Sequence, residues 1–305
     1  MMQPVIRGLE TSGELQKLYS FYPKVFKKTP LDFFVRRIEN DPYLQLDDIR
    51  IAEEDGGITS SVAVIRRTMY WGGESVPFGG IGNVSSLPEK RGTGMASDVM
   101  NDALEHIKKM GMKVSILFTG INPFYERFRF VTVPAHIMRF NMLKKYESDY
   151  MIRNFSYADL EKVSAIYKEF NADLFGPIVR DMAYWNANLK FAEPDEIFLV
   201  AEKNGGIEGY IRVVPPNSRN EIWEFGFTNI NAFKALLSEA AEILNKDELK
   251  TEALCPPGLL SDTDVFRISY EPSTIAMALL AENGSLNASL KYGFSAYSFW
   301  WTDNF

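Results

Sequence analysis

A glycine-rich turn at residues 91–96 (RGTGMA) is the stretch of this sequence best suited to bind an anionic group. It opens an amphipathic helix, because apolar residues recur at four-residue spacing from Met95 to Ile107. Gly111 is the expected left-handed cap of that helix. Such a turn presents free backbone N–H groups and the positive end of the helix dipole, which suit a phosphate or pyrophosphate, and Arg91 adds a positive charge. The alternative is that the two glycines only form a tight strand-to-helix turn.

The neighbouring elements would place this turn at the end of a buried strand. Strands are predicted at 84–87 and 114–119, on either side of the helix, and a short aromatic helix at 122–130 (NPFYERFRF) follows. Asn122 is the expected N-cap of that short helix, with Pro123 in its first turn. Gly82 indicates a bulge in the first strand, because glycine inside a strand pattern often marks one.

This order of elements resembles the GNAT N-acetyltransferases, whose acyl-CoA loop is written Q/R-x-x-G-x-G/A. Arg91, Gly94 and Ala96 stand on the signature positions, and residues 122–130 resemble the family's "fYerfGF" helix. The turn matches neither the Walker loop nor the GxGxxG dinucleotide fingerprint. In the resembled family the two strands splay apart, and the pantetheine arm of acetyl-CoA lies between them. The resemblance implies cofactor contacts at Val84, Ser85, Ser86, Leu87, Arg91, Gly92, Thr93, Gly94, Met95 and Ala96.

The reaction that the resemblance implies is direct attack of a primary amine on the thioester of acetyl-CoA. It needs an oriented thioester, a proton donor for the leaving thiolate and a base. Tyr125 matches the tyrosine of the family's helix and is the candidate proton donor, since a phenol with a pKa near 10 can protonate a departing thiolate. The alternative is that Tyr125 is one more core aromatic. Arg129 stands where the family usually has glycine, so we expect the exit of this helix to depart from the family pattern.

An internal repeat divides the chain into two related units. Residues 51–58 (IAEEDGGI) are matched by residues 200–207 (VAEKNGGI), an offset of 207 − 58 = 149. In the first copy the pair Asp55-Gly56, between two strand-like runs, predicts a β-hairpin. We therefore predict a first domain at 1–145 and a second at 150–305. The second copy lacks the Arg-x-x-Gly-x-Gly/Ala loop before its helix at 232–244, where Asn231 is the expected N-cap, so we expect it to hold no pyrophosphate.

A competent first unit followed by a degenerate second one resembles the enhanced intracellular survival (Eis) family of acetyltransferases. The resemblance implies an α/β (α+β) fold of two tandem GNAT-like units, each a mixed, mostly antiparallel twisted sheet flanked by helices. Members usually carry a third, sterol-carrier-like domain, which we expect this chain, ending at Phe305, to lack. The family uses its C-terminal carboxylate as the base, and the strand before the loop (78–85) offers no acid. Phe305 is therefore a candidate base; the alternative is a final strand at 294–301 with a frayed tail.

Aromatic residues crowd two predicted helices near the N-terminus, at 14–26 and 31–38. Most such residues belong to a core. In the resembled fold, however, these helices roof the acceptor pocket, so Tyr22, Phe26 and Phe34 are candidate substrate contacts.

Composition excludes several classes of function. A length of 305 residues suggests about two domains, and a net charge of −7 with a pI near 5.1 argues against nucleic acid as the main partner. A single cysteine, Cys255, excludes an internal disulfide, and two histidines make a metal site unexpected. Of these, His106 is expected to face solvent. No signal peptide or membrane-spanning apolar run is present, so we expect a soluble, cytoplasmic protein that does not bind membranes.

The function expected is therefore acetyl-CoA-dependent transfer of an acetyl group to a primary amine of a small cationic or peptide substrate. A non-catalytic acyl-CoA-binding or partner-binding module is the main alternative, and a pseudo-enzyme that binds no CoA is a third. The sequence leaves open the acceptor and the oligomeric state, although the resemblance favours a homo-oligomer.

Overall fold

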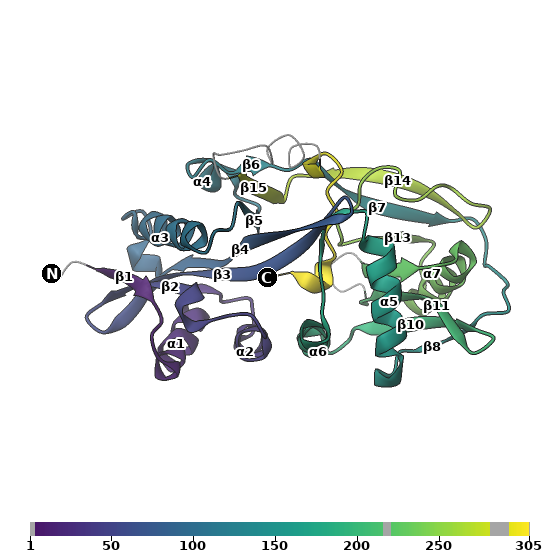
Figure 1. The fold of residues 1–305 in the computed structure, drawn as a ribbon, viewed down its shortest axis with the longest axis horizontal. Helices are drawn as coiled ribbons and strands as arrows, with labels where there is room; N and C mark the ends of the chain where they lie inside the picture. Colours follow the sequence, from purple (N-terminus) through teal and green to yellow (C-terminus); the bar gives the residue numbers. More distant parts are fainter. Residues whose placement is uncertain (1–3, 216–220, 281–292, 305) are drawn as a thin grey trace.

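The computed structural model describes residues 4–215, 221–280 and 293–304, which form two α/β halves side by side (Figure 1). The first half holds β1 (Val5–Gly8), α1 (Leu15–Val25), α2 (Leu31–Asn40), β2 (Ile49–Glu54), β3 (Gly57–Trp71), β4 (Glu74–Ser86), α3 (Met95–Lys109), β5 (Val114–Phe118), α4 (Asn122–Glu126), β6 (Val131–Thr132) and β7 (Ala135–Met142). The second half holds β8 (Met151–Asn154), α5 (Leu160–Asn171), β9 (Phe175–Ile178), α6 (Met182–Phe191), β10 (Ile197–Lys203), β11 (Gly206–Val213), β12 (Ile222–Phe227), α7 (Ile230–Leu244), β13 (Glu248–Lys250), β14 (Phe266–Ser273) and β15 (Ala276–Leu280).

Three sheets organise these elements. The largest has eight strands in the order β1-β2-β3-β4-β5-β15-β6, with β9 paired to β3. The second sheet has the order β12-β11-β10-β8, and the third has the order β13-β7-β14. Nearly all neighbouring strands are antiparallel, whereas β4 and β5 are parallel. The predicted fold class of mixed, mostly antiparallel sheets flanked by helices is confirmed.

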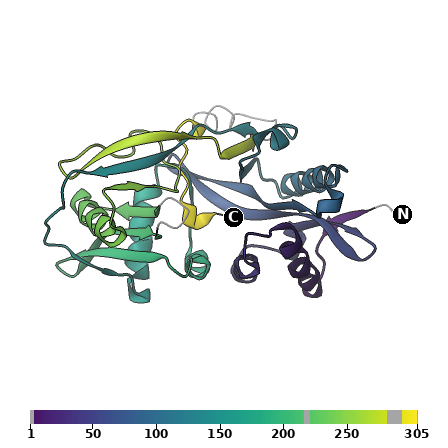
Figure 2. The same cartoon turned by 180° about the vertical axis from the view of Figure 1, so that it is seen from behind.

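Helices cover both faces of the first sheet, with α3 on one face and α1 and α2 on the other (Figures 1 and 2). The apolar stripe predicted for α3 is confirmed, because Met95, Val99, Ala103 and Ile107 are all buried in the cluster between this helix and the sheet. Gly111 follows the helix with φ of 74°, as expected of a left-handed cap. The amphipathic pattern thus fixes which side of α3 faces the sheet and leaves its N-terminus at the end of β4.

The prediction that His106 faces solvent is wrong. Its side chain is 12% exposed, and its Nε2 atom lies 2.8 Å from Oδ1 of Asp48. Asp48 is itself fully buried and also accepts hydrogen bonds from Arg66. The polar neighbours of His106 along the sequence gave no sign of this partner, which lies 58 positions away.

The two matching hairpins of the sequence adopt the same conformation. Asp55 and Gly56 turn β2 into β3 with φ of 48° and 77°, and Asn204 and Gly205 turn β10 into β11 with φ of 53° and 76°. The strand registers agree as well, because residue 52 pairs with 60 and residue 201 pairs with 209. The hairpin predicted at Asp55-Gly56 is therefore confirmed, and its match in the repeat forms the same hairpin.

An ion-pair network recurs with the hairpins. Arg7 on β1 binds Glu14 at 2.5 Å and Glu53 at 2.7 Å. In the second half Arg153 on β8 binds Asp159 at 2.6 Å and Glu202 at 2.9 Å. The same three positions thus tie the first strand of each half to its hairpin and to the turn that starts its first helix.

Strands cross between the halves. β15, from the second half, lies between β5 and β6 in the first sheet, and β7, from the first half, pairs with both β13 and β14. β7 and β14 run side by side in both views (Figures 1 and 2). The domain boundary between 145 and 150 remains a prediction. Two of the sheets contain strands from both sides of it.

The strand predicted at 294–301 is not formed. Tyr297 and Phe299 make only isolated bridges, to Phe175 and Leu254, and residues 301–303 form a single 3-10 turn, η5 (Trp301–Asp303). Side-chain contacts, described below, hold these residues in place of a strand ladder. No helix among the described residues is long and apolar enough to cross a membrane.

Candidate active site

The end of β4 separates from its parallel neighbour β5. The two strands pair only at Gly79 with Ser115 and at Gly80 with Ile116. Beyond Gly80 the described register gives β4 no partner on β5, so the backbone groups on that edge are open to another hydrogen-bonding chain. This is the splayed pair of strands that the GNAT resemblance implies.

A bulge distorts β4 at the same place. Ser61 pairs with Ser85 while Ala63 pairs with Gly82, so Asn83 and Val84 together oppose one residue of β3. Asn83 takes the left-handed conformation, with φ of 52°. The bulge predicted at Gly82 therefore begins one residue later, because asparagine tolerates this conformation better than most residues with a side chain.

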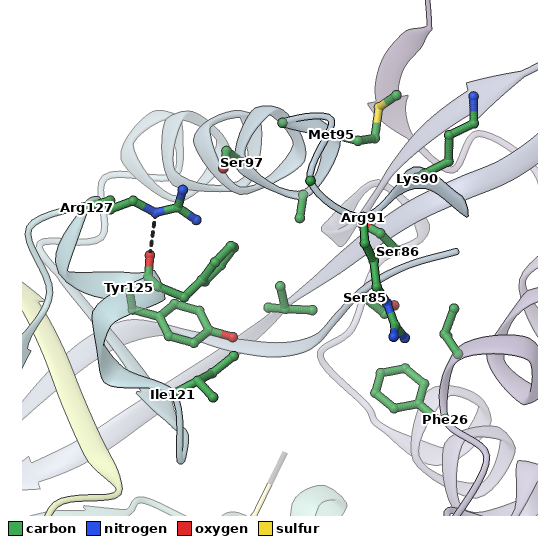
Figure 3. Close-up of a pocket in the computed structure, with 16 residues that line it drawn as sticks. Phe26, Ser85, Ser86, Lys90, Arg91, Met95, Ser97, Ile121, Tyr125 and Arg127 are labelled. Atoms are coloured by element: carbon green, nitrogen blue, oxygen red, sulfur yellow. Dashed lines mark hydrogen bonds between the residues drawn. The ribbon is translucent and has the colours of Figure 1, made fainter. Parts of the chain in front are cut away.

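A cavity of about 520 Å³ opens where the strands separate, a size within the usual range for small-molecule sites. Figure 3 shows Tyr125 and Ile121 on one side of it and Arg91 with Ser85 on the other. Its lining comes from β4, the glycine turn, α3, α4 and α1, and comprises Val25, Phe26, Val84, Ser85, Ser86, Lys90, Arg91, Gly92, Gly94, Met95, Ala96, Ser97, Ile121, Phe124, Tyr125 and Arg127.

The glycine turn leaves its backbone exposed to this cavity. Gly92 and Gly94 have φ of 79° and 93°, and a Cβ atom added to either would meet nothing within 4 Å. Gly94 is the N-cap of α3, so the N–H groups of Met95 and Ala96 point out of the helix end with no acceptor inside the helix. The turn therefore offers hydrogen-bond donors and a partial positive charge toward open space.

Three basic side chains line the cavity. Lys90 is paired with Glu54 across the strands, and Arg91 is exposed beside the cavity. Arg127, which the sequence analysis did not single out, lies with its guanidinium 4.5 Å from the ring centre of Phe124 and donates from Nε to the Phe124 carbonyl at 3.2 Å (Figure 3). Arg127 directly follows α4, two residues after Tyr125, and this position is its only sequence signal.

Tyr125 lines the cavity from α4 and is 8% exposed. Burial raises the pKa of Tyr125 to about 12, because desolvation disfavours the phenolate. The hydroxyl therefore keeps its proton at neutral pH and is available as a hydrogen-bond or proton donor.

The ends of α4 differ from the sequence analysis in detail. Its N-cap is Ile121, not Asn122, whose Nδ2 atom instead donates to Thr132 and to the carbonyl of Thr274, each at 2.9 Å. Pro123 lies in the first turn, as predicted. Arg129 has φ of 68°, a left-handed conformation that glycine adopts without strain, so the backbone at the exit is one that suits a glycine. Arg129 therefore differs from the family's glycine in its side chain, while its backbone has a conformation that suits glycine.

Not every predicted contact reaches this cavity. Leu87 packs in the core cluster beneath α1 and α2, and the hydroxyl of Thr93 donates to the Lys90 carbonyl at 2.8 Å. Tyr22 is fully buried and lines no described cavity. Phe305 lies outside the described residues.

A second, smaller cavity of about 30 Å³ lies beyond the bulge. Phe26, on the wall of the larger cavity, and Phe34, on the wall of the smaller one, are in ring contact with centroids 4.9 Å apart. The predicted substrate contacts Phe26 and Phe34 therefore stand on different cavities. The smaller one is lined by Phe34, Arg37, Ile38, Asp41, Leu44, Ala63, Ile65, Arg67, Asn83, Tyr184, Phe191 and Asn304.

The second half has no equivalent of the glycine turn. The pair Tyr210 and Gly226 occupies the register of Ser61 and Ser85. From there α7 begins 230 − 227 = 3 residues after β12, whereas α3 begins 95 − 86 = 9 residues after β4. The turn is thus shorter by six residues, and Trp300 packs against Phe225 where β12 would face a ligand, with centroids 5.0 Å apart. The missing loop in the second copy is confirmed.

The N-cap of α7 lies two residues before the predicted one, Asn231. It is Asn229, whose side chain accepts from the backbone N–H of Asn231 at 3.0 Å. Asn231 itself lies inside the helix.

Part of the first half matches a known family of domains. Residues 6–132 match the family described as acetyltransferase (GNAT) domain. Among solved structures, a GCN5-related N-acetyltransferase from Anabaena variabilis has 15% identity and a TM-score of 0.71, with 92% of this chain and 73% of that chain covered. A probable N-acyltransferase from Enterococcus faecalis has 19% identity and a TM-score of 0.74, with the same coverage. Eis1 from Mycobacterium abscessus has 17% identity and a TM-score of 0.66, with 94% and 76% covered.

These likenesses extend over both halves and show a shared fold. No functionally curated protein matches this chain. The resemblance to GNAT acetyltransferases, and to Eis proteins among them, is confirmed.

Proposed function

We propose that this acyltransferase, which carries a GNAT domain over residues 6–132, is an N-acetyltransferase that uses acetyl-CoA and acetylates a primary amine by direct attack. One observation carries the proposal. The glycine turn at the start of α3, the open edge of β4 and Tyr125 all line a single cavity. A phosphate site, a backbone edge and a proton donor are what a thioester-dependent acyl transfer requires.

The residues present suit acetyl-CoA. The N–H groups of residues 92–96 would hold the pyrophosphate, with Arg91 and Arg127 as cationic partners. The edge of β4 that faces away from β3, at Val84 and Ser86, would hydrogen-bond the pantetheine arm. The Ser85 carbonyl instead accepts a hydrogen bond from the Ser60 hydroxyl on β3 at 2.7 Å. When bound, acetyl-CoA supplies an activated acetyl group.

The chain's own groups would then guide the proton. Tyr125 holds a proton at neutral pH on the cavity wall and would give it to the departing thiolate. The acceptor amine would approach past the bulge at Asn83, the one residue of this bend that lines the smaller cavity. The proposed base is the C-terminal carboxylate of Phe305, as the family resemblance implies. We propose a small cationic molecule or a peptide as the source of the amine.

The direct test is an amine screen. Purified protein is mixed with acetyl-CoA and with polyamines, aminoglycosides or lysine peptides, and free thiol and acetylated amine are followed together. We expect thiol release that depends on the amine and equals the acetylated product. Binding of acetyl-CoA with only slow hydrolysis, whichever amine is offered, would instead identify a non-catalytic CoA-binding module.

Arg91→Ala should weaken acetyl-CoA binding. Water screens part of the attraction between an exposed arginine and a phosphate group. We therefore expect an increase in the Kd of acetyl-CoA of about 3- to 10-fold at low salt. Calorimetric titration gives the value, and added salt should narrow the difference from wild type. Lys108→Ala is the matched control, because Lys108 is an exposed cation at the far end of the same helix, with a side chain 76% exposed. An unchanged Kd in Arg91→Ala would remove Arg91 from the site.

A further inference from the structure

We propose that the second half completes the acceptor pocket by pinning residues 301–304 through a buried ion cluster centred on Arg180. This inference rests on the proposed function, in which the acceptor amine approaches past Asn83. The smaller cavity that Asn83 lines has about 30 Å³, room for the amino group of the acceptor, and is here called the acceptor pocket. It assigns to the half that lacks a phosphate loop a positioning role in the reaction of the other half.

Arg180 is fixed on all sides. Its side chain is fully buried, with Nη2 at 2.6 Å from Oε2 of Glu224 and 2.7 Å from Oδ2 of Asp303. Its Nε atom donates to Oδ1 of Asp303 at 2.9 Å. The guanidinium carbon lies 4.1 Å from the ring centre of Tyr167 and 4.4 Å from that of Trp185. A planar group held by two carboxylates and two rings has one orientation. Its hydrogen bonds therefore fix the position of the Asp303 carboxylate as well.

Further contacts hold the residues just before Asp303. Asn188 on α6 donates from Nδ2 to the carbonyl of Thr302 at 2.8 Å, and Arg180 donates to the Thr302 hydroxyl at 2.8 Å. That hydroxyl in turn donates to Glu224. Phe299 and Leu254 exchange two backbone hydrogen bonds, each of 2.9 Å. The segment is therefore tied to α6, to β12 and to the loop before β14.

The cluster lies at the junction of the two halves. Arg180 follows β9, the strand of the second half that pairs with β3, and the backbone N–H of Val179 donates to the carbonyl of Thr68 at 2.8 Å. Figure 1 shows η5 between α6 and β3. Any shift of the second half against β3 would therefore move residues 301–304 as well.

The next residue reaches the smaller cavity. Asn304 lines it together with Tyr184 and Phe191 from α6, opposite Asn83 of the bulge and Phe34 of α2. One wall of the cavity thus comes from the second half, and Asn304 is the part of that wall that the cluster places directly.

The charges favour a geometric role over a stabilising one. The cluster joins three carboxylates, of Glu196, Glu224 and Asp303, to two guanidinium groups, of Arg180 and Arg212. All of these side chains except that of Glu196 are at least 99% buried. Buried ion clusters of this kind are often no more stable than well-packed apolar residues of the same volume. What they do supply is a single arrangement of the groups that they join.

The test compares Asp303→Ala with Asp159→Ala. Asp159 is also a buried aspartate paired with an arginine of the second half, but it does not touch residues 301–304. We expect Asp303→Ala to raise the KM of the amine about tenfold or more while the Kd of acetyl-CoA changes by less than about twofold. Asp303→Asn, which keeps the shape and one acceptor, should recover most of the loss. Asp159→Ala should move neither constant by more than about twofold.

A second variant and a second readout keep the proposal testable. Asn304→Ala leaves the ion cluster intact and should raise the KM of the amine by itself. Carboxypeptidase digestion of the folded chain, followed by mass spectrometry, reports the 301–304 segment without any need for activity, and we expect Asp303→Ala to release C-terminal residues much faster than wild type or Asp159→Ala.

Equal digestion rates in all three proteins would overturn the pinning, and an unchanged amine KM in both Asp303→Ala and Asn304→Ala would overturn the link to the acceptor pocket. If wild type acetylates no amine, the proposed function fails, and the pocket role falls with it. The digestion result still decides whether the cluster pins the segment.

Discussion

Replacing Gly94 by glutamate is expected to abolish acetyl-CoA binding, with an increase in Kd of at least about 100-fold, or ~2.7 kcal/mol. A Cβ at Gly94 would meet nothing within 4 Å, so the new side chain would enter the open space of the cavity. There its carboxylate would occupy the space in front of the helix N-terminus and repel the pyrophosphate. Calorimetric titration with acetyl-CoA measures the loss.

Gly111→Glu provides the matched control. Gly111 lies just past the opposite end of the same helix with φ of 74°, and a Cβ there would also meet nothing within 4 Å. Both variants therefore carry the same added charge and a similar cost of about 1–2 kcal/mol for a side chain in the left-handed conformation. We expect both to melt earlier than wild type and only Gly94→Glu to lose binding. Equal losses of affinity in the two would show that strain, and not the cavity, is responsible.

Tyr125→Phe is expected to lower kcat by about 100-fold or more, the usual contribution of a positioned general acid. The substitution removes one hydroxyl and keeps the ring contacts with Phe124 and Phe130, at centroid distances of 4.9 and 6.3 Å. The Kd of acetyl-CoA should therefore change by less than about twofold. Tyr157→Phe is the control, because Tyr157 lies in the second half, is 65% exposed, and donates from its hydroxyl to Asn186 of the same half. A Tyr125→Phe enzyme with more than half the wild-type turnover would exclude the acid role.

The pKa of Tyr125 sets the pH range of this prediction. Because burial raises it to about 12, above the ordinary value near 10, Tyr125 stays protonated through pH 10. Turnover should show no decline from this residue between pH 7 and 10. The folded state holds this proton more tightly than the unfolded chain does, so the associated stability is complete below about pH 10 and is lost as the pH rises toward 12.

Local patterns predicted the parts of the site that depend on neighbours in sequence. The glycine turn, the apolar stripe of α3 and the Asp55-Gly56 hairpin all follow from steric preferences within a few residues. The second hairpin lies at the residues that match the first one in the internal repeat. The proposed cofactor contacts came from the family resemblance, and eight of the ten line the cavity, all except Leu87 and Thr93.

Contacts between distant segments were not predictable in this way. Arg180 and Asp303 are 123 positions apart, and His106 and Asp48 are 58 apart. The two members of such a pair have no regular spacing in the sequence. Each charged residue considered alone would be predicted to face solvent. The insertion of β15 into the first sheet was not predicted for the same reason. A strand pattern indicates that a segment is extended, but it does not indicate which sheet the segment joins.

The most direct test of the central claim is the melting temperature of the wild-type protein as a function of acetyl-CoA concentration. A ligand that binds only the folded state stabilises it by about 2.7 kcal/mol at 100 times its Kd. At about 2–4 °C per kcal/mol, this predicts a rise of several degrees that saturates with concentration. A melting temperature that stays constant at every acetyl-CoA concentration would contradict the account, because the glycine turn would then be a structural turn with no cofactor to hold.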